Sequence, residues 1–476
     1  MNKKERKIRK PTRIESYLII ILMLIIIGIG ASVFDANIKI LLIICAACNL
    51  ILAWRCGYTW QMVEEKIGET VGGLASTIVV MLGIGFVIST WMFSGTAPAL
   101  VYWLGALVSP NVIMVLSFVL TGAMSLMIGS SFATMGTLGI VLFSAGIAQG
   151  LPAGVMAATV ICGANVGQYL SPLADCVSYN AGINKISIYK HIKMLAVPVI
   201  AATVLTIIFY VVCGFSFTSS GTVSMDAINA LRTEISQNFN ISILCVVPLL
   251  AALALCFLKT PPALALFSSG FSAIIIGMIT QKFSLLDGFE TAWSGFNSSI
   301  LNNSNISEEL SSFLNRGGSF SLADSIFMMV IAMITIDILG LIGVFDVIRD
   351  SLLKNIQNAR HLTITTALFS SVFTVITTNS WTSCAVTTEA MKESYHKAGY
   401  VSDSISAVTA ACTYMVEQFL PWAFLAIYSA SVYGVTVADY VPWAVFFPFV
   451  TVITIIYYSV VKLEPYAQPE ERSVNE

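Results

Sequence analysis

The chain has 476 residues, of which 57% are hydrophobic and only 11% are charged, and its formal net charge is −2. Soluble domains carry about 25% charged residues, so this composition excludes an ordinary soluble domain. Apolar stretches long enough to cross a bilayer as helices, about 20 residues each, recur along the whole chain. The sequence therefore predicts an all-α, polytopic membrane protein that has the lipid bilayer as a partner.

The first region of the chain is a basic segment, 1–16, followed by apolar stretches at 17–35 and 38–54 and a loop that extends to residue 71. A secretion signal is an alternative for 17–35. However, this stretch is long, lacks a convincing cleavage site and is followed at once by a second apolar stretch. We therefore expect both stretches to be retained as membrane spans.

The rest of the chain contains further apolar stretches, and the total is roughly 11–14 membrane segments. Two of them, 131–148 and 380–391, are rich in Gly, Ser and Thr and are better explained as half-helices or re-entrant segments. The predicted segments after residue 71 are 72–94, 111–128, 131–148, 151–170, 191–213, 241–258, 262–280, 322–345, 362–378, 380–391, 403–430 and 440–461.

The distribution of Lys and Arg predicts the orientation in the membrane. When the basic N-terminus is placed in the cytoplasm, the basic residues collect on the predicted cytoplasmic loops. The exceptions are Lys39, Arg232, Lys282 and Arg316. This positive-inside bias predicts a plasma-membrane protein with both termini, including the tail 463–476, in the cytoplasm.

Two segments about 250 residues apart share a sequence pattern. AATVICGANVGQYL (157–170) aligns without gaps with AVTAACTYMVEQFL (407–420), and Ala, Thr, Cys, Val, Gln and Leu are identical. Two shorter matches lie upstream: LASTI (74–78) with LADSI (322–326), and SFAT (131–134) with SWTS (380–383). The offsets are 248, 249 and 250 residues, so the three matches share one register.

This register predicts two transport repeats, 72–213 and 322–462, which are joined by loops and two spans in 214–321. In the predicted topology, the first spans of the repeats run in opposite directions. Inverted repeats with discontinuous helices are typical of secondary transporters.

Both copies of the longest match end at a proline, in VGQYLSP and VEQFLP. Proline interrupts a helix because it lacks an amide hydrogen and collides with the preceding turn. Unpaired backbone at membrane depth is tolerated where it is buried in protein or lines a cavity. We expect Ser171 to cap a new helical segment that begins at Pro172.

Three acids lie in or beside predicted spans: Asp175, Asp337 and Glu417. Acids at membrane depth usually mark an ion or proton path, and no basic residue is evident inside the spans. Burial disfavours the charged form of a carboxylate, so a proton and a small cation can compete for it. We predict these acids as cation- or proton-binding residues, with Asp175 as a sodium ligand. The alternatives are a helix N-terminal acid for Asp175 and hydrogen-bonded structural acids for the other two.

Hydroxyl and amide groups are also enriched in two stretches, IGSSFATMGT (128–137) and TTNSWTSCAVTT (377–388). Their oxygens suit sodium or a small polar solute, although small polar residues also favour helix packing in membranes. The residues predicted to line a substrate cavity are Ser130, Ser131, Thr134, Asn165, Gln168, Ser171, Asn379, Ser380, Thr382, Ser383 and Gln418.

Several functional classes lack support in the sequence. There is no phosphate-binding Gly-Lys-Ser/Thr loop, and the basic N-terminus is explained by topology rather than by nucleic-acid binding. Nearly all of the ten cysteines lie inside apolar stretches, and there are only three histidines, so we expect no metal cofactor. A channel or a membrane enzyme has little support, since neither a repeated filter nor a nucleophile–base pair is present. We therefore expect a carrier without a cofactor.

The motifs resemble the NhaC family of sodium/proton antiporters in the ion-transporter superfamily, of which this chain would be a divergent member. ISTWMFSGTAPALVYW (88–103) is similar to the family's tryptophan–small–Gly-Thr-x-Pro segment, and GANVGQYLSPLADC (163–176) to its stretch ending in Ser-Pro-Leu-Ser-Asp. SWTS and the later Pro-Trp of 421–422 are similar to its second-half motifs. The resemblance implies that Ser171 and Asp175 border the cation site, with Ser94, Gly95 and Thr96 nearby.

The resemblance implies exchange of cytoplasmic sodium for external protons by alternating access. The chain departs from the family pattern at Gln168 and Tyr169, where relatives carry an acid and then a base, and at Ala423, where they carry asparagine. Glu417 can supply the carboxylate missing at position 168. The alternative is a sodium- or proton-coupled carrier of a small organic or amino acid on the same fold. The oligomeric state stays open, with a homodimer as one option.

Overall fold

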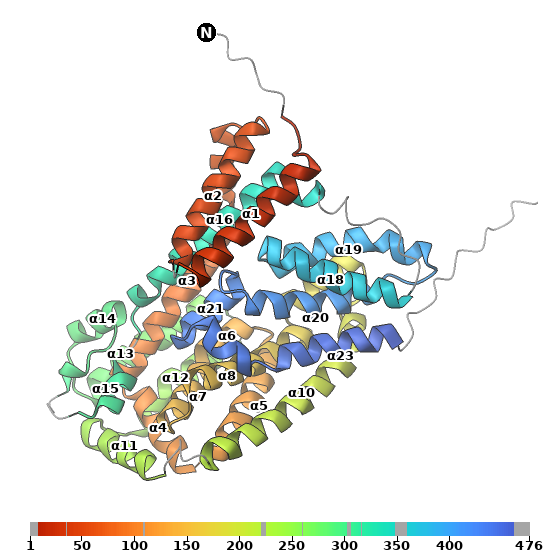
Figure 1. The fold of residues 1–476 in the computed structure, drawn as a ribbon. Coiled ribbons are helices and arrows are strands. Elements are labelled where there is room, and N and C mark those ends of the chain that lie inside the picture. Colours follow the sequence, from red (N-terminus) through yellow and green to blue (C-terminus); the bar gives the residue numbers. More distant parts are fainter. Residues whose placement is uncertain are drawn as a thin grey trace, which may run out of the picture.

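The computed structural model describes residues 8–34, 36–107, 110–219, 225–258, 260–301, 306–315, 317–347 and 359–460. All the regular elements in these ranges are helices, which confirms the predicted all-α fold (Figure 1). The predicted C-terminal tail lies outside the described residues.

The first part of the chain contains α1 to α10, with one π-helical turn, η1. Their bounds are α1 (Arg13–Ser32), α2 (Ile38–Arg55), α3 (Trp60–Phe93), α4 (Thr96–Leu107), α5 (Pro110–Ile128), α6 (Ser131–Thr134), η1 (Met135–Gly139), α7 (Ile140–Ala148), α8 (Ala153–Leu170), α9 (Asp175–Asn184) and α10 (Ile188–Ser219).

The second part contains the remaining helices, with four short 3₁₀ turns. Their bounds are α11 (Met225–Asn238), η2 (Ile243–Val246), α12 (Val247–Phe257), α13 (Pro262–Thr280), α14 (Leu285–Ser294), η3 (Ser298–Ile300), α15 (Glu308–Leu314), η4 (Ser319–Leu322), α16 (Ala323–Ile342), α18 (Ala359–Thr377), α19 (Ser380–Lys397), α20 (Ser404–Phe419), α21 (Phe424–Tyr433), α22 (Val437–Tyr440), η5 (Val441–Trp443) and α23 (Phe446–Val460).

Eight helices in the described residues are long and apolar enough to cross a membrane, or up to eleven if each of three bent helix pairs is one span. Val112–Ile128 and His361–Thr377 are shorter apolar helices. Large aliphatic side chains are exposed along α10, for example Val197, Ile200, Val204 and Ile208. Exposed apolar surface of this kind fits contact with lipid, and the chain is a multi-pass membrane protein.

The helices α1, α2 and α16 form an arm that projects from the rest of the molecule (Figure 1). The side-chain amide of Asn49 on α2 donates to the Thr335 carbonyl of α16 over 2.8 Å. On the other side, α16 packs against the long helix α3. The packing of α16 against α3 therefore connects the arm to the rest of the molecule.

The helix α8 ends at Leu170 and α20 ends at Phe419, in each case two residues before a proline. A residue that precedes proline is disfavoured in the helical region, because the proline ring collides with its backbone. Accordingly Ser171 and Leu420 are extended, with ψ of 124° and 117°. The predicted interruptions at both prolines are therefore present.

The prediction that Pro172 opens the next helix is wrong, because α9 begins at Asp175 with Ala174 as its N-cap. The Ser171 hydroxyl is used otherwise: it donates to the Leu126 carbonyl over 2.8 Å and accepts from the Leu173 amide. These bonds hold a turn between α8 and α9 rather than capping a helix.

Backbone landmarks around the two breaks recur at a constant spacing of 249 residues. They are the positive φ of Gly129 and Thr378, the starts of α6 and α19 at Ser131 and Ser380, the ends of α8 and α20, and the starts of α9 and α21 at Asp175 and Phe424. This spacing pairs Gln168 with Glu417, whereas the gapless sequence alignment paired it with Gln418. The inverted relation of the repeats and the domain boundaries stay predictions.

The short helix after each break packs against the other half of the chain. The Tyr179 hydroxyl of α9 donates to the Trp381 carbonyl of α19 over 3.1 Å. In the converse direction, the Tyr428 hydroxyl of α21 donates to the Phe132 carbonyl of α6 over 2.9 Å. This exchange of helices brings the two breaks face to face.

Candidate functional site

A cavity of about 650 Å³ lies between the two breaks. The first residues of four helices line it: Ser131 of α6, Asp175 of α9, Ser380 of α19 and Phe424 of α21. The start of a helix presents unpaired amide groups and a partial positive charge. The cavity is therefore surrounded by backbone that favours negative side chains.

All three predicted acids, Asp175, Asp337 and Glu417, line this one cavity. The structure thus brings together carboxylates that are separated by up to 242 residues in the sequence. The other predicted residues that line the cavity are Ser130, Ser131, Gln168, Asn379, Ser380 and Thr382.

Glu417 lies in the last turn of α20 and is only 3% exposed. Its Oε2 accepts a hydrogen bond from the Ser380 amide at the start of α19 over 3.1 Å. A carboxylate at a helix N-terminus is stabilised by the helix dipole, which offsets part of the cost of burial. Among the described residues no Lys or Arg forms an ion pair with Glu417. A proton or a bound cation is therefore left to balance its charge.

Asp175 and Asp337 have different surroundings. Asp175 is exposed at the first position of α9 and faces the space of the cavity. Asp337 is half-buried on α16 and accepts a hydrogen bond from the Thr70 hydroxyl of α3 over 2.6 Å. Near this contact, Lys66 pairs with Glu69 over 3.2 Å. Lys66 is the basic residue among the described residues that line the cavity.

Several predicted cavity residues lie in the helix packing instead, because their polar groups bond to neighbouring helices or to their own turn. The hydroxyls of Thr134 and Ser383 donate to the carbonyls of Ser130 and Ser370 over 2.9 Å each. The Asn165 amide donates to the Ile161 carbonyl over 2.7 Å. The side-chain amide of Gln418 donates to the Tyr440 hydroxyl over 2.9 Å. The predicted cavity residues that lie in the helix packing are therefore Thr134, Asn165, Ser171, Ser383 and Gln418.

Ser94 and Thr96 are also misplaced by the sequence argument. Their hydroxyls bond to each other over 2.7 Å, buried where α3 ends and α4 begins. The part of α3 that lines the cavity ends at Val80. A helix rises 1.5 Å per residue, so Ser94 lies about 20 Å farther along α3.

The sequence argument treated residues 60–71, the first third of α3, as part of a loop, and it assigned no cavity residue to α3 before Ser94. The α3 residues that face the cavity include Lys66, Thr70, Gly73, Thr77 and Val80. Their spacing of four, three, four and three residues marks one face of a helix, and the polar members of this stripe, Lys66, Thr70 and Thr77, could have revealed it. The aromatic residues that line the cavity, Phe132, Trp381, Tyr414, Phe424 and Tyr428, carry no comparable pattern.

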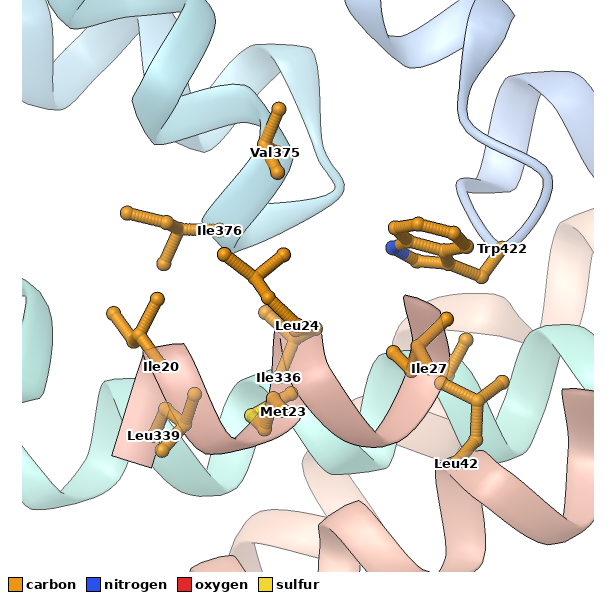
Figure 2. Close-up of a pocket in the computed structure, with 11 residues that line it drawn as sticks. Ile20, Met23, Leu24, Ile27, Leu42, Ile336, Leu339, Val375, Ile376 and Trp422 are labelled. Atoms are coloured by element: carbon orange, nitrogen blue, oxygen red, sulfur yellow. The ribbon is translucent and has the colours of Figure 1, made fainter. Parts of the chain in front are cut away.

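A second, smaller cavity of about 30 Å³ lies among α1, α2, α16 and α18. Figure 2 shows Leu24 of α1 facing Ile376 of α18, and Ile27 of α1 beneath the Trp422 ring. Its lining side chains are aliphatic apart from the Met23 thioether and the Trp422 ring, so they offer no oxygen ligand to a cation. The polar cavity is the candidate site.

Residues 163–463, more than half of the chain, match the model of the Na⁺/H⁺ antiporter family. An uncharacterized Na⁺/H⁺ antiporter of Haemophilus influenzae is 29% identical over 93% of this chain and 95% of its own length. The Na⁺/H⁺ antiporter NhaC of Alkalihalophilus pseudofirmus is 28% identical over 94% and 96%. A malate-2H⁺/Na⁺-lactate antiporter of Bacillus subtilis is 24% identical over 92% of each chain.

These matches confirm the resemblance drawn from the motifs, and they include both breaks and the acids Asp175, Asp337 and Glu417. They also identify the chain as a transporter rather than an enzyme. The chain belongs to the Na⁺/H⁺ antiporter family, as a divergent member similar to the NhaC proteins.

Proposed function

We propose that this protein exchanges sodium for protons across the plasma membrane by alternating access. Sodium leaves the cytoplasm, protons enter it, and the basic N-terminal segment faces the cytoplasm. The observation that carries this proposal is the position of Glu417, a buried carboxylate without a basic partner among the described residues, in the same cavity as Asp175 and Asp337.

Asp175 is placed to capture the cation. It is exposed to the cavity and lies beside a helix break, where the last carbonyls of α8 lack the amide partners of a continuing helix, although the Gln168 carbonyl accepts from the Cys176 thiol over 3.2 Å. Unwound carbonyls and helix ends coordinate Na⁺ in other secondary transporters. Asp337, which Thr70 orients, supplies a third carboxylate along the same cavity.

Glu417 is placed to exchange the proton. Its burial makes an uncompensated negative charge costly, so it is stable either protonated or with a cation nearby. When sodium enters the cavity, the ionised form is favoured and the proton leaves. When the cavity opens to the other side and sodium departs, Glu417 takes up a proton again.

The test is sodium-driven pH change in proteoliposomes of the purified protein. Competition predicts that the apparent KM for sodium rises as pH falls, while the maximal rate changes little. Glu417→Gln keeps the size of the side chain and a hydrogen-bond acceptor but cannot exchange a proton, so the pH change and its pH dependence should both be lost.

The matched control is Glu393→Gln, because Glu393 lies on α19 in an exposed pair with Lys397. This variant should transport as the wild type does. Size-exclusion profiles check that both variants are folded. If Glu417→Gln retains proton flux with the wild-type pH dependence, then Glu417 is structural, and Asp175 or Asp337 must carry the proton.

The second candidate is coupled transport of a small organic or amino acid in the same cavity. A volume of about 650 Å³ favours it, because a bare monovalent cation fills only a small part of such a space. The relative named as a malate-2H⁺/Na⁺-lactate antiporter supports organic solutes as cargo within this family.

A further inference from the structure

The size of the cavity raises the question of its second occupant. Its volume of about 650 Å³ falls within the roughly 300–1,000 Å³ that is usual for small-molecule sites. One water molecule takes about 30 Å³ in the liquid, so the cavity has room for an organic molecule as well as a cation with its waters.

The charges of the cavity favour a cationic occupant. Lys66 and Glu69 form an ion pair and offset each other, which leaves Asp175, Asp337 and Glu417 as the remaining charged groups of the lining. An organic anion would have to enter a space with this excess of carboxylates. The excess is lowered by any proton on Glu417 but does not change sign.

Two of the four helix starts around the cavity, those of α6 and α19, are already used by the protein, whereas those of α9 and α21 have no side-chain cap. The Ser130 hydroxyl accepts from the Ala133 amide at the start of α6, and the Asn379 side chain accepts from the Thr382 amide at the start of α19. Glu417 also accepts from the Ser380 amide. Anion binding at helix N-termini needs free amide groups, so these two ends offer little to a carboxylate substrate.

Aromatic rings form part of the wall. Phe132 and Trp381 occupy equivalent positions, 249 residues apart, in the first turns of α6 and α19. The Phe132 ring meets Tyr428 edge-to-face at 4.5 Å and lies 5.7 Å from Phe424. The face of an aromatic ring attracts an ammonium group and also covers an apolar body.

Two neutral acceptors in the lining have no partner in the described part of the chain. They are Oγ of Ser131, a residue only 2% exposed, and Oε1 of Gln168. A buried polar atom without a hydrogen bond is costly, and a ligand donor removes this cost. An ammonium group carries three N–H donors, enough for both acceptors and one carboxylate.

We propose that the cavity binds a small organic ammonium ion with an apolar or aromatic body, and that this ligand competes with sodium. Organic carboxylates of the same size should bind at least tenfold more weakly, because the lining already carries an excess of carboxylates. The inference deepens the proposed function, because it rests on the same cavity and names the chemical class of a second ligand.

The test compares two probes that share one body and differ in charge: phenethylamine and 3-phenylpropionate. Binding of tritiated phenethylamine to the purified full-length protein is measured by scintillation proximity in a sodium-free buffer. We expect saturable binding that unlabelled phenethylamine displaces at least tenfold better than 3-phenylpropionate does. Added sodium should displace the bound amine as well.

Substitutions at Trp381 link the binding to this cavity. Trp381→Leu should weaken phenethylamine binding about fivefold, the usual size of a cation–π contribution, and Trp381→Phe should restore most of it. Trp293→Leu is the matched control, because Trp293 is exposed on α14 and does not line the cavity. The inference is overturned by the absence of saturable binding, or by equal displacement by the amine and the carboxylate.

The proposed function is measured separately, as ²²Na⁺ counterflow in proteoliposomes at clamped pH. Sodium counterflow without saturable amine binding would overturn the inference alone. Amine binding without sodium counterflow would overturn the proposed sodium exchange and leave the inference standing.

Discussion

The two helix breaks have almost the same backbone but carry their charge at different places. In the first half, Gln168 precedes the break and Asp175 begins the next helix. In the second half, the equivalent positions are Glu417 and Phe424. Each half thus contributes one carboxylate here, from opposite sides of its break. The repeated backbone builds the cavity, and the side chains at two positions divide the chemistry between the halves.

The difference extends to solvent access. Asp175 is exposed in the cavity, whereas Glu417 is only 3% exposed and is bonded to the Ser380 amide. An exposed carboxylate keeps its charge at low cost and attracts cations. A buried carboxylate is charged only when something compensates it. This asymmetry is why we assign cation capture to the first half and proton exchange to the second.

The largest expected contrast tests whether the halves are inverted. Ser187 and Thr436 are exposed and lie 249 residues apart, just after α9 and α21. With the predicted topology, a membrane-impermeant maleimide added to intact cells should label Thr436→Cys but not Ser187→Cys. After permeabilisation both should react.

The native cysteines allow this experiment with one replacement. They are buried except for the half-buried Cys48, so the background protein is Cys48→Ser. Labelling of both positions from the same side would show that the two repeats run in the same direction.

The next effect is expected at Asp175. Asp175→Asn removes the exposed charge but keeps the shape of the side chain, and sodium-driven exchange should fall at least a hundredfold in proteoliposomes. Thermal unfolding in detergent should stay close to that of the wild type, because the carboxylate makes no ion pair among the described residues. Exchange at the wild-type rate would limit Asp175 to supporting the start of α9.

A moderate effect is expected when the first half is given the acid of the second. Gln168→Glu places a carboxylate at the position equivalent to Glu417, in the same cavity. A second exchangeable proton should make the apparent KM for sodium depend more steeply on pH than in the wild type. The added change in KM should be up to tenfold per pH unit. Sodium-driven exchange measured from pH 6 to pH 9 checks this, with Gln149→Glu, buried outside the lining, as a comparison. An unchanged slope would show that the two positions are not functionally equivalent.

The smallest effects concern the turns that precede α6 and α19. Gly129 and Thr378 both have positive φ, of 78° and 50°. A Cβ at position 129 would lie 2.6 Å from the Leu173 carbonyl carbon, so Gly129→Thr should destabilise the protein by about 2 kcal/mol or more. Thr378→Gly relieves the strained φ but loses a buried side chain, so its net effect should stay within about 1 kcal/mol. Thermal unfolding in detergent measures both. If both substitutions lowered the stability of the protein equally, the turns at Gly129 and Thr378 would not be stabilised by the same interactions.

Local features of the sequence determined the class of the protein and the positions of the breaks. Hydropathy over about 20 residues is enough to indicate membrane spans, and the ring of Pro172 or Pro421 acts on the residue before it. The motifs around these prolines also carried the resemblance to the antiporter family. The acids of the site could be selected for the same local reason, since a carboxylate in an apolar stretch is costly wherever the chain goes.

Only the tertiary structure decided which residues share the cavity. Thr70 and Asp337 meet because α3 packs against α16, and the helices after the breaks cross to the opposite half. Ser94 has the same chemistry as the lining serines, yet it lies about 20 Å along the helix from the cavity. The one-residue shift that pairs Gln168 with Glu417 is likewise visible only in the backbone, because sequence identity in this segment favours the neighbouring register, which pairs Gln168 with Gln418. Hydropathy and proline act over a few residues, whereas the lining of a cavity depends on contacts between helices that are distant in the chain.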